Sequence, residues 1–214
     1  MTVKQEKLAA LFRQATVIPV LTIDRVEDAV PLARALVAGG VRVLEVTLRT
    51  PVAIDPAKAI MAEVPDAIVG IGTILNEGDL KRAQALGAVF GISPGATSDL
   101  LKAAAASGLP FAPGITTASE LMQALAHGFD LVKFFPAEPS GGIRALRALA
   151  GPFPDIRFCP TGGIGEANAA SWLAEPNVVA VGGSWLCPAA DIRSGNWAGI
   201  SAICDRTMKL LKPA

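Results

Sequence analysis

The sequence predicts an α/β fold and, within that class, a (β/α)8 TIM barrel with an N-terminal helix. Eight short runs of Val, Ile, Leu and Phe alternate with Ala-rich helical stretches along the chain. Near-continuous apolar runs are typical of parallel strands that are covered on both faces. Eight strands with short connections favour a closed barrel over an open doubly wound sheet, which is the alternative. Residues 1–214 are therefore expected to form a single barrel domain.

The elements follow in a regular order. An amphipathic segment at residues 2–14 is expected to be a helix that closes the barrel floor. The expected strands span residues 16–23, 41–48, 67–75, 88–93, 110–115, 131–135, 156–160 and 178–182. The expected helices between them include residues 25–38, 77–85, 98–106, 117–126 and 166–174. Several of these helices end at glycine, as at Gly39, Gly87 and Gly128, where a left-handed cap is expected.

Composition excludes several classes of protein. The 19 basic residues balance the 19 acidic residues, and no basic cluster is interleaved with aromatics, so no nucleic-acid partner is expected. No apolar run approaches the ~20 residues that span a bilayer, and the first residues are charged, unlike a secretory signal. We therefore expect a cytoplasmic enzyme without a membrane partner. Cys159, Cys187 and Cys204 fit neither a disulfide framework nor a zinc site, and all three are expected to be reduced.

Candidate functional residues gather at the predicted carboxyl ends of the strands, where the active sites of such barrels lie. These positions are Glu45, Thr47 and Arg49; Gly72 and Thr73; Ser93 and Pro94; Pro113 and Gly114; Lys133; Thr161, Gly162 and Gly163; and Gly182, Gly183 and Ser184.

Lys133 is unusual because it lies within a predicted strand. The other lysines fall on helical segments, at Lys4, Lys7, Lys58, Lys81, Lys102, Lys209 and Lys212. Side chains alternate along a strand, so Lys133 shares its face with Leu131 and Phe135. A buried ammonium is costly, whereas an apolar wall favours the neutral amine that a nucleophile needs. The alternative is a lysine that snorkels to solvent or pairs structurally.

Glu45 lies among aliphatic residues on a predicted inner strand, on the same face as Val43 and Thr47. A carboxylate and a lysine on different strands of one barrel can share its lumen and stabilise each other's charge. One can then act as the nucleophile and the other as the proton carrier. A purely structural Glu–Lys ion pair is the alternative.

Two glycine pairs follow the last two predicted strands, at Thr161-Gly162-Gly163 and Gly182-Gly183-Ser184. Loops after these strands often bind phosphate in barrel enzymes, because glycine lets backbone N–H groups approach the anion. Gly-Gly is also common in ordinary turns, so it is the position of both pairs after the last two strands that indicates a phosphate site.

Metal chemistry is not expected. His127 is the only histidine, it falls near a predicted helix end, and no set of matching ligands accompanies it. Trp172, Trp185 and Trp197 are expected to pack in the interior.

With these residues identified, the chain resembles the 2-keto-3-deoxy-6-phosphogluconate (KDPG) aldolase family, also called 2-dehydro-3-deoxy-phosphogluconate aldolase. The matching segments occur in family order and cover the chain from the first strand to beyond the eighth. They are GVRVLEVTLRT at 40–50, IGTIL at 71–75, FGISPG at 90–95, FAPGI at 111–115, VKFFPAE at 132–138, RFCPTGGI at 157–164 and VGGSWL at 181–186.

The resemblance implies a class I lyase of the Entner–Doudoroff pathway, usually a homotrimer, which needs no cofactor. Such an aldolase cleaves KDPG to pyruvate and glyceraldehyde 3-phosphate through a Schiff base. Many members also cleave 4-hydroxy-2-oxoglutarate (KHG) to pyruvate and glyoxylate.

The resemblance also implies roles for individual residues. Lys133 would form the imine and Glu45 would move protons. Arg49 and Thr73 would hold the pyruvyl portion, and Pro94 and Phe135 would line the pocket. Gly162, Gly163 and Ser184 would approach the phosphate, and Thr161 and Gly183 would also belong to the substrate-binding site.

Three other functions stay open at this point. An aldolase for the galactose-configured analogue, 2-keto-3-deoxy-6-phosphogalactonate, is the nearest, although Thr161 fits the gluconate branch better. A phosphosugar isomerase or epimerase on the same fold would use Glu45 as base and would not need the lysine nucleophile. A non-catalytic sugar-phosphate binding module would bind ligand without turnover.

Overall fold

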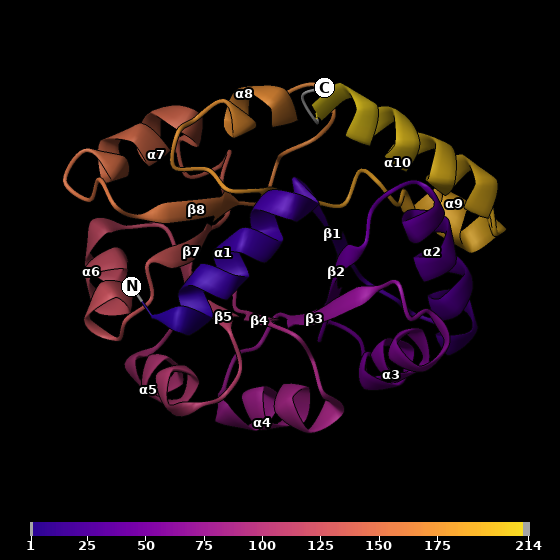
Figure 1. The fold of residues 1–214 in the computed structure, drawn as a ribbon, viewed down its shortest axis with the longest axis horizontal. Coiled ribbons are helices and arrows are strands. Elements are labelled where there is room, and N and C mark those ends of the chain that lie inside the picture. The colour runs from indigo at the N-terminus through magenta and orange to yellow at the C-terminus, as the bar shows by residue number, and fades with distance from the viewer. Residues whose placement is uncertain (1, 212–214) are drawn as a thin grey trace.

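The computed structural model describes residues 2–211, and Lys212, which the sequence pattern placed on a helical segment, lies outside that range. Its parallel strands form two curved sheets surrounded by helices (Figure 1). The strands are β1 Val17–Leu21, β2 Val43–Thr47, β3 Ile68–Gly72, β4 Gly91–Ile92, β5 Phe111–Ala112, β6 Gly114–Ile115, β7 Leu131–Phe134, β8 Arg157–Pro160 and β9 Val181–Gly183. One sheet has the order β5-β4-β3-β2-β1-β9 and the other β6-β7-β8.

Each of the eight predicted strand segments overlaps an observed strand, the eighth only at residues 181–182, which confirms the α/β class. The predicted fifth strand is divided at Pro113, between β5 and β6. Proline has no N–H to donate to a neighbouring strand. The carbonyl of Pro113 still accepts from the N–H of Lys133 at 2.9 Å, so the chain continues alongside β7.

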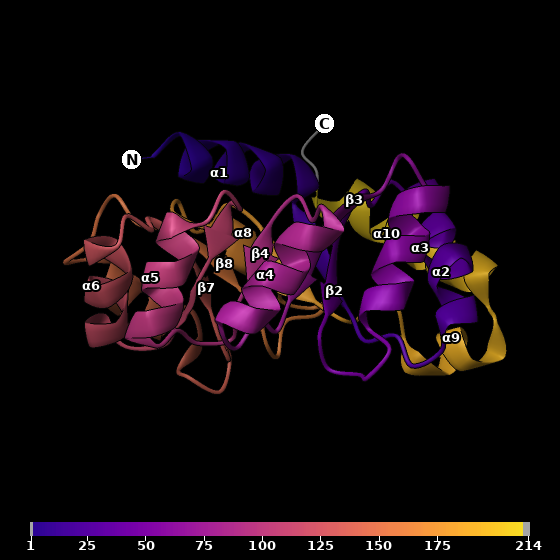
Figure 2. The ribbon, with the colours of Figure 1, turned by 90° about the horizontal axis from the view of Figure 1, so that it is seen from below.

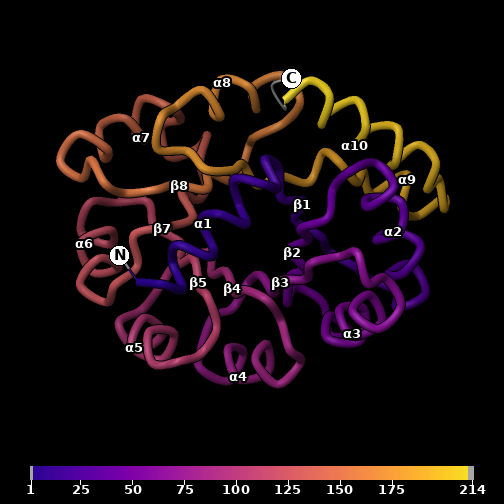
Figure 3. Tube along the Cα trace, viewed as in Figure 1, coloured from indigo at the N-terminus to yellow at the C-terminus, as the bar shows by residue number. Residues whose placement is uncertain are grey.

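Helices connect the strands and complete the outer layer. They are α1 Val3–Ala15, α2 Val26–Ala38, α3 Ile54–Glu63, α4 Glu77–Leu86, α5 Ser98–Ala106, α6 Ala118–Ala126, α7 Gly142–Ala150, α8 Ala169–Leu173, α9 Ala189–Ser194 and α10 Trp197–Leu211. Figure 3 shows the chain passing around the ring until α10 reaches α2, against which it packs. The close approach requires Gly39, where a side chain would overlap Cys204.

The helix predicted at residues 166–174 begins later than expected, at Ala169. Asn168 is the reason, because its side-chain oxygen accepts from the N–H of Gly165 at 2.8 Å and closes a turn. Such side-chain hydrogen bonds compete with the helix ladder. Residues 166–168 therefore belong to the loop after β8.

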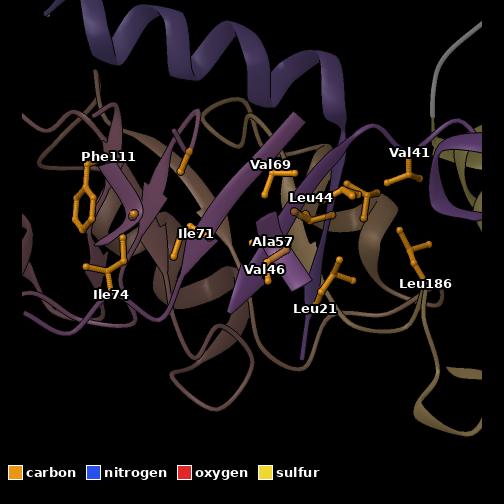
Figure 4. Packing of buried hydrophobic residues seen from close by; sticks show 14 of the residues in the cluster. Leu21, Val41, Leu44, Val46, Ala57, Val69, Ile71, Ile74, Phe111 and Leu186 are labelled. Atoms are coloured by element: carbon orange, nitrogen blue, oxygen red, sulfur yellow. The ribbon is translucent and has the colours of Figure 1, made fainter. Parts of the chain in front are cut away.

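Apolar residues fill the space between the strands and the outer helices. Figure 4 shows part of this layer, with Leu44, Val46 and Val69 on the strands and Ala57 on α3. All four side chains are buried in one continuous cluster. This outer layer fixes the strands against their helices and leaves their other face for the interior.

The interior is closed at one end by α1, which lies across the amino-terminal ends of the strands (Figure 2). Leu8 and Phe12 of α1 pack in a second buried cluster with Phe90 and Leu131. The Gln5 side chain donates to the carbonyl of Phe111 at 2.8 Å and accepts from the N–H of Leu131 at 2.9 Å. The interior between the strands therefore opens toward their carboxyl-terminal ends. Among residues 2–211 no helix is both long and apolar enough to cross a membrane.

Candidate active site

Lys133 and Glu45 meet in the interior from opposite sheets. Lys133 Nζ on β7 lies 3.2 Å from Glu45 Oε1 on β2, and the two residues are 2% and 1% exposed. Their neighbours by alternation, Leu131 and Val43, lie in the same interior cluster. The inward orientation predicted for both charged residues is therefore confirmed, and the lysine does not snorkel to solvent.

Glycine makes room for the Glu45 carboxylate. Gly72 pairs with Thr47 at the end of β3, and a Cβ at Gly72 would overlap Glu45 Oε1. Gly70, two residues earlier on the same strand, leaves space for the ring of Phe90 in the same way. The two glycines weaken β3, but on one face of it they admit two large side chains, one from each neighbouring segment. The position of Glu45 thus depends on β3 as well as β2.

Cys159 is the third titratable group beside this pair. Burial raises the pKa of its thiol to about 12, and the positive charge of Lys133 only partly opposes that shift. Burial also raises the pKa values of Cys187 and Cys204 to about 12. All three cysteines are free thiols, as the sequence predicted. With their protons held this firmly, they have little nucleophilic or metal-binding character at neutral pH.

A cavity of about 250 Å³ opens at the carboxyl ends of the strands. Its wall consists of Val20, Thr22, Arg49, Phe135, Thr161, Gly162, Gly163, Ile164, Gly183 and Ser184. Seven of these are residues that the sequence proposed for substrate binding: Arg49, Phe135, Thr161, Gly162, Gly163, Gly183 and Ser184. The ring centroid of Phe135 lies 5.2 Å from Lys133 Nζ, so this side chain connects the cavity wall to the buried amine.

Thr22 is a wall residue that the sequence argument missed. It follows β1, and its hydroxyl lies 3.3 Å from the hydroxyl of Thr47, which itself donates to the carbonyl of Leu21 at 2.8 Å. The same signal that identified the other candidates, a polar residue at a strand end, applies to Thr22. Thr22 lies inside the predicted strand at residues 16–23, one residue before its end, so it does not stand out as a strand-end residue.

Two predicted residues lie outside the cavity wall that these ten residues form, namely Thr73 and Pro94. Thr73 has a left-handed backbone, with φ of 59°, which is rare for a β-branched residue. Its hydroxyl accepts from Arg49 Nε at 3.2 Å and so orients the guanidinium. Pro94 lies against Gly114, where a side chain would overlap the Pro94 carbonyl.

The two glycine loops lie side by side, because Thr161 and Gly182 form a parallel bridge. Gly162 and Gly163 have φ values of 103° and 78°, a conformation that other residues rarely adopt. At Gly183 a side chain would overlap the indole of Trp185. Arg49 is the one charged side chain among the described wall residues, so the cavity combines a cation with glycine-rich backbone. This combination suits an anionic ligand.

No group of three or more potential metal ligands occurs within residues 2–211. His127 is the C-cap residue of α6 and does not belong to the cavity wall. Trp172 is completely buried in the outer core, where it packs as predicted, and Trp185 and Trp197 are partly buried against the same core.

Known proteins resemble the whole chain. Residues 8–203 match the family model described as KDPG and KHG aldolase. The 2-dehydro-3-deoxy-phosphogluconate aldolase of Pseudoalteromonas atlantica is 53% identical, over 95% of this chain and 92% of that protein. The KHG/KDPG aldolase of Escherichia coli K12 is 52% identical, over 92% of this chain and 90% of that protein.

A solved structure gives the same result for the fold. The KDPG aldolase of Legionella pneumophila, with pyruvate captured at low pH as a covalent carbinolamine intermediate, superimposes with a TM-score of 0.91. It shares 47% sequence identity, and the match covers 93% of this chain and 97% of that one.

Proposed function

The chain belongs to the KDPG and KHG aldolase family, and on that premise we propose which bonds it breaks and which residues break them. It is an aldolase, hence a lyase. The substrate is KDPG, which is cleaved to pyruvate and glyceraldehyde 3-phosphate. KHG is the second substrate and yields pyruvate and glyoxylate, as the name of the E. coli relative indicates for that enzyme.

The observation that carries this proposal is the buried contact of 3.2 Å between Lys133 Nζ and Glu45 Oε1 next to an anion-suited cavity. The neutral amine of Lys133 attacks the C2 ketone of the substrate. The resulting carbinolamine takes up a proton at its hydroxyl, loses water and becomes a protonated imine. The pyruvate carbinolamine of the Legionella relative supports this sequence of steps.

The imine then acts as the electron sink for cleavage. Glu45 accepts the proton of the C4 hydroxyl, directly or through water, and the C3–C4 bond breaks. The electron pair of that bond moves into the imine and forms an enamine, while the C4 fragment leaves as an aldehyde. Glu45 then returns its proton to C3 of the enamine, and hydrolysis of the resulting imine releases pyruvate and restores Lys133. Because the protonated imine formed on Lys133 accepts the electron pair, the steps require no metal or organic cofactor.

The ends of the substrate are held by the other predicted residues. Arg49, oriented by Thr73, pairs with the pyruvyl carboxylate as a charge-assisted donor. Phe135 and Pro94 bound the pyruvyl portion. The phosphate lies against Thr161, Gly162, Gly163, Gly183 and Ser184, whose glycines permit close approach of backbone N–H groups.

We further propose that the two sheets amount to one closed (β/α)8 barrel in a single domain of residues 1–214. Two observations support closure. β5 and β6 are separated only by Pro113, and the bridges Phe158–Val178 and Thr161–Gly182 connect β8 with the approach to β9. A homotrimer is proposed from family resemblance alone, and a solution mass three times that of the 22.0 kDa chain is the expected measurement. The cytoplasmic location stays a prediction.

The deciding experiment measures pyruvate release from KDPG, its galactonate analogue and KHG side by side. We expect turnover of KDPG and KHG, with KDPG favoured over the galactonate analogue. Faster cleavage of the galactonate analogue would assign the other branch, and turnover without pyruvate release would contradict aldol cleavage. Replacing Gly163 with valine provides the second arm, because its left-handed backbone and its contact with Glu138 exclude a side chain. It should impair KDPG cleavage far more than KHG cleavage.

A further inference from the structure

We infer that Glu138 is a positioning residue that fixes the anion-binding loop at residues 161–168. The inference rests on the proposed function, because it assigns this loop to the substrate phosphate. Glu138 lies between β7 and α7, two residues after Pro136. It is absent from the cavity wall, whereas Gly162 and Gly163 form part of it. Glu138 therefore acts on the anion site through the loop and has no contact with the cavity.

The carboxylate of Glu138 joins two elements on the outer side of the loop. Its Oε1 accepts from the indole N–H of Trp172 at 2.8 Å and from the side-chain amide of Asn168 at 3.0 Å. Trp172 belongs to α8 and is completely buried, so it is a fixed anchor in the outer core. The carboxylate thus ties the loop to the core.

Asn168 carries this connection into the loop backbone. Its amide also donates to the carbonyl of Gly163 at 3.2 Å, and its oxygen accepts from the N–H of Gly165 at 2.8 Å. The backbone of Glu138 contributes as well, since its N–H donates to the carbonyl of Gly162 at 3.0 Å. Gly162, Gly163 and Gly165 are therefore each linked to Glu138, either directly or through Asn168.

Packing between Glu138 and Gly163 supports the same role. A Cβ at Gly163 would lie 2.6 Å from Glu138 Cβ, so the loop backbone rests directly on the Glu138 side chain. A loop with two left-handed glycines has large conformational freedom when it is not restrained. Restraining it in advance lowers the entropy that ligand binding must overcome.

The negative charge of Glu138 is unexpected beside a site for an anion. An acidic residue beside a phosphate site opposes anion binding, so electrostatics alone would disfavour it here. Its acceptor oxygen, which bonds both Trp172 and Asn168, explains the position. Glutamine retains that oxygen and removes the charge. The two properties can therefore be separated by comparing the glutamine and alanine variants.

The test compares Glu138→Ala, Glu138→Gln and Glu166→Ala with wild type, using KM and kcat for KDPG and KHG. Glu166 is the matched control because it lies on the same loop and pairs with Arg206 on α10 at 2.8 Å, where both side chains are well exposed. Exposed pairs contribute little. We expect Glu138→Ala to raise the KM for KDPG about tenfold, with less than a twofold change for KHG. Glu138→Gln and Glu166→Ala should stay within about twofold of wild type for both substrates.

Equal effects of Glu138→Ala on the two substrates would overturn the inference, as would a glutamine variant as defective as the alanine variant. A ³¹P NMR titration with inorganic phosphate separates this result from a failure of the proposed function. If wild type binds phosphate but does not cleave KDPG, the proposed function fails, and weaker phosphate binding by Glu138→Ala still tests the inference. Should Glu138→Ala not fold, Asn168→Ala removes the link to Gly163 and must show the same selective loss.

Discussion

Lys133 and Arg157 are buried cations on adjacent strands, but their surroundings differ. Arg157 begins β8 near the floor, where its guanidinium lies 2.7 Å from Asp130 and 3.3 Å from Glu6 of α1. Both partners are partly exposed, so water shares in their solvation. Lys133 faces one carboxylate at 3.2 Å, that of Glu45, and this partner is as deeply buried as the lysine.

The difference separates a structural cation from a chemical one. A guanidinium stays charged under all conditions in a protein and suits a permanent bridge between the floor helix and the sheet. An ammonium can lose its proton and become a nucleophile. A buried ion pair is weak evidence for a stabilising role. The pair of Lys133 and Glu45, which lies beside the cavity, is therefore better explained by a role in the reaction. The residue type at each position agrees with this division.

The largest expected effect comes from Lys133→Arg, which keeps a cation beside Glu45 but cannot form an imine. Loss of a covalent nucleophile lowers turnover by on the order of 10⁴- to 10⁶-fold. Borohydride with pyruvate should add a reduced pyruvyl mass to the Lys133 peptide in wild type and no mass in the variant. Labelling of another lysine would remove Lys133 from the mechanism.

Glu45→Gln should have the next largest effect. The amide keeps the volume of the side chain but cannot carry a proton, and general acid–base assistance is worth about 10²–10⁴-fold. Exchange of the pyruvate methyl protons with solvent deuterium should slow by that factor, while imine trapping persists.

If the pair of Glu45 and Lys133 is purely structural, Glu45→Gln should lower the stability of the protein and leave the exchange rate nearly unchanged. Removing one partner of a buried pair costs roughly 3–5 kcal/mol in the free energy of unfolding. Thermal unfolding measured beside the exchange rate distinguishes the two roles. A folded variant with near-normal exchange would exclude Glu45 as the proton carrier.

Arg157→Lys tests the other side of the comparison and should change stability but not catalysis. A lysine cannot reproduce the forked contacts with Asp130 and Glu6, so we expect a loss of about 1–3 kcal/mol in unfolding free energy. The kcat should stay within about twofold. Arg42→Lys, at an exposed position, is the matched control. A large loss of kcat with unchanged stability would show that the floor pair participates in the reaction.

The smallest effect concerns the cysteines. Burial raises the pKa of Cys159 to about 12, so its thiol stays protonated at pH 8 even beside Lys133, and the thiolate forms only as the pH approaches 12. Cys187 and Cys204 share the direction of the shift and its cause. Iodoacetamide should therefore modify the native enzyme slowly and leave its activity intact, whereas unfolded protein should react at all three thiols. Rapid modification of native Cys159 at pH 8 would show that its thiol is accessible to the reagent and not buried.

Much of the site could be predicted from strand alternation and position. Strand alternation grouped Lys133 with Leu131 and Glu45 with Val43, and the cost of burying a lone charge favoured a lumen that both share. The glycine loops followed from their order after the last strands. Thr22 does not stand out in this way, because it lies inside the predicted strand at residues 16–23. Glu138 could not be found from strand position, because its partners Asn168 and Trp172 lie thirty or more residues later in the chain.

The sequence by itself determined the order of strands and helices, the side chains that share a face of each strand and the residue types at the strand ends, because these depend on local periodicity. The tertiary structure alone decided that Lys133 and Glu45, 88 residues apart, lie at 3.2 Å, and that Gly72 supplies the space. It also decided that α8 begins at Ala169, because Asn168 bonds Gly165, Gly163 and Glu138 instead of extending the helix. Contacts of this kind depend on how curved sheets bring distant segments together, and periodicity carries no information about them.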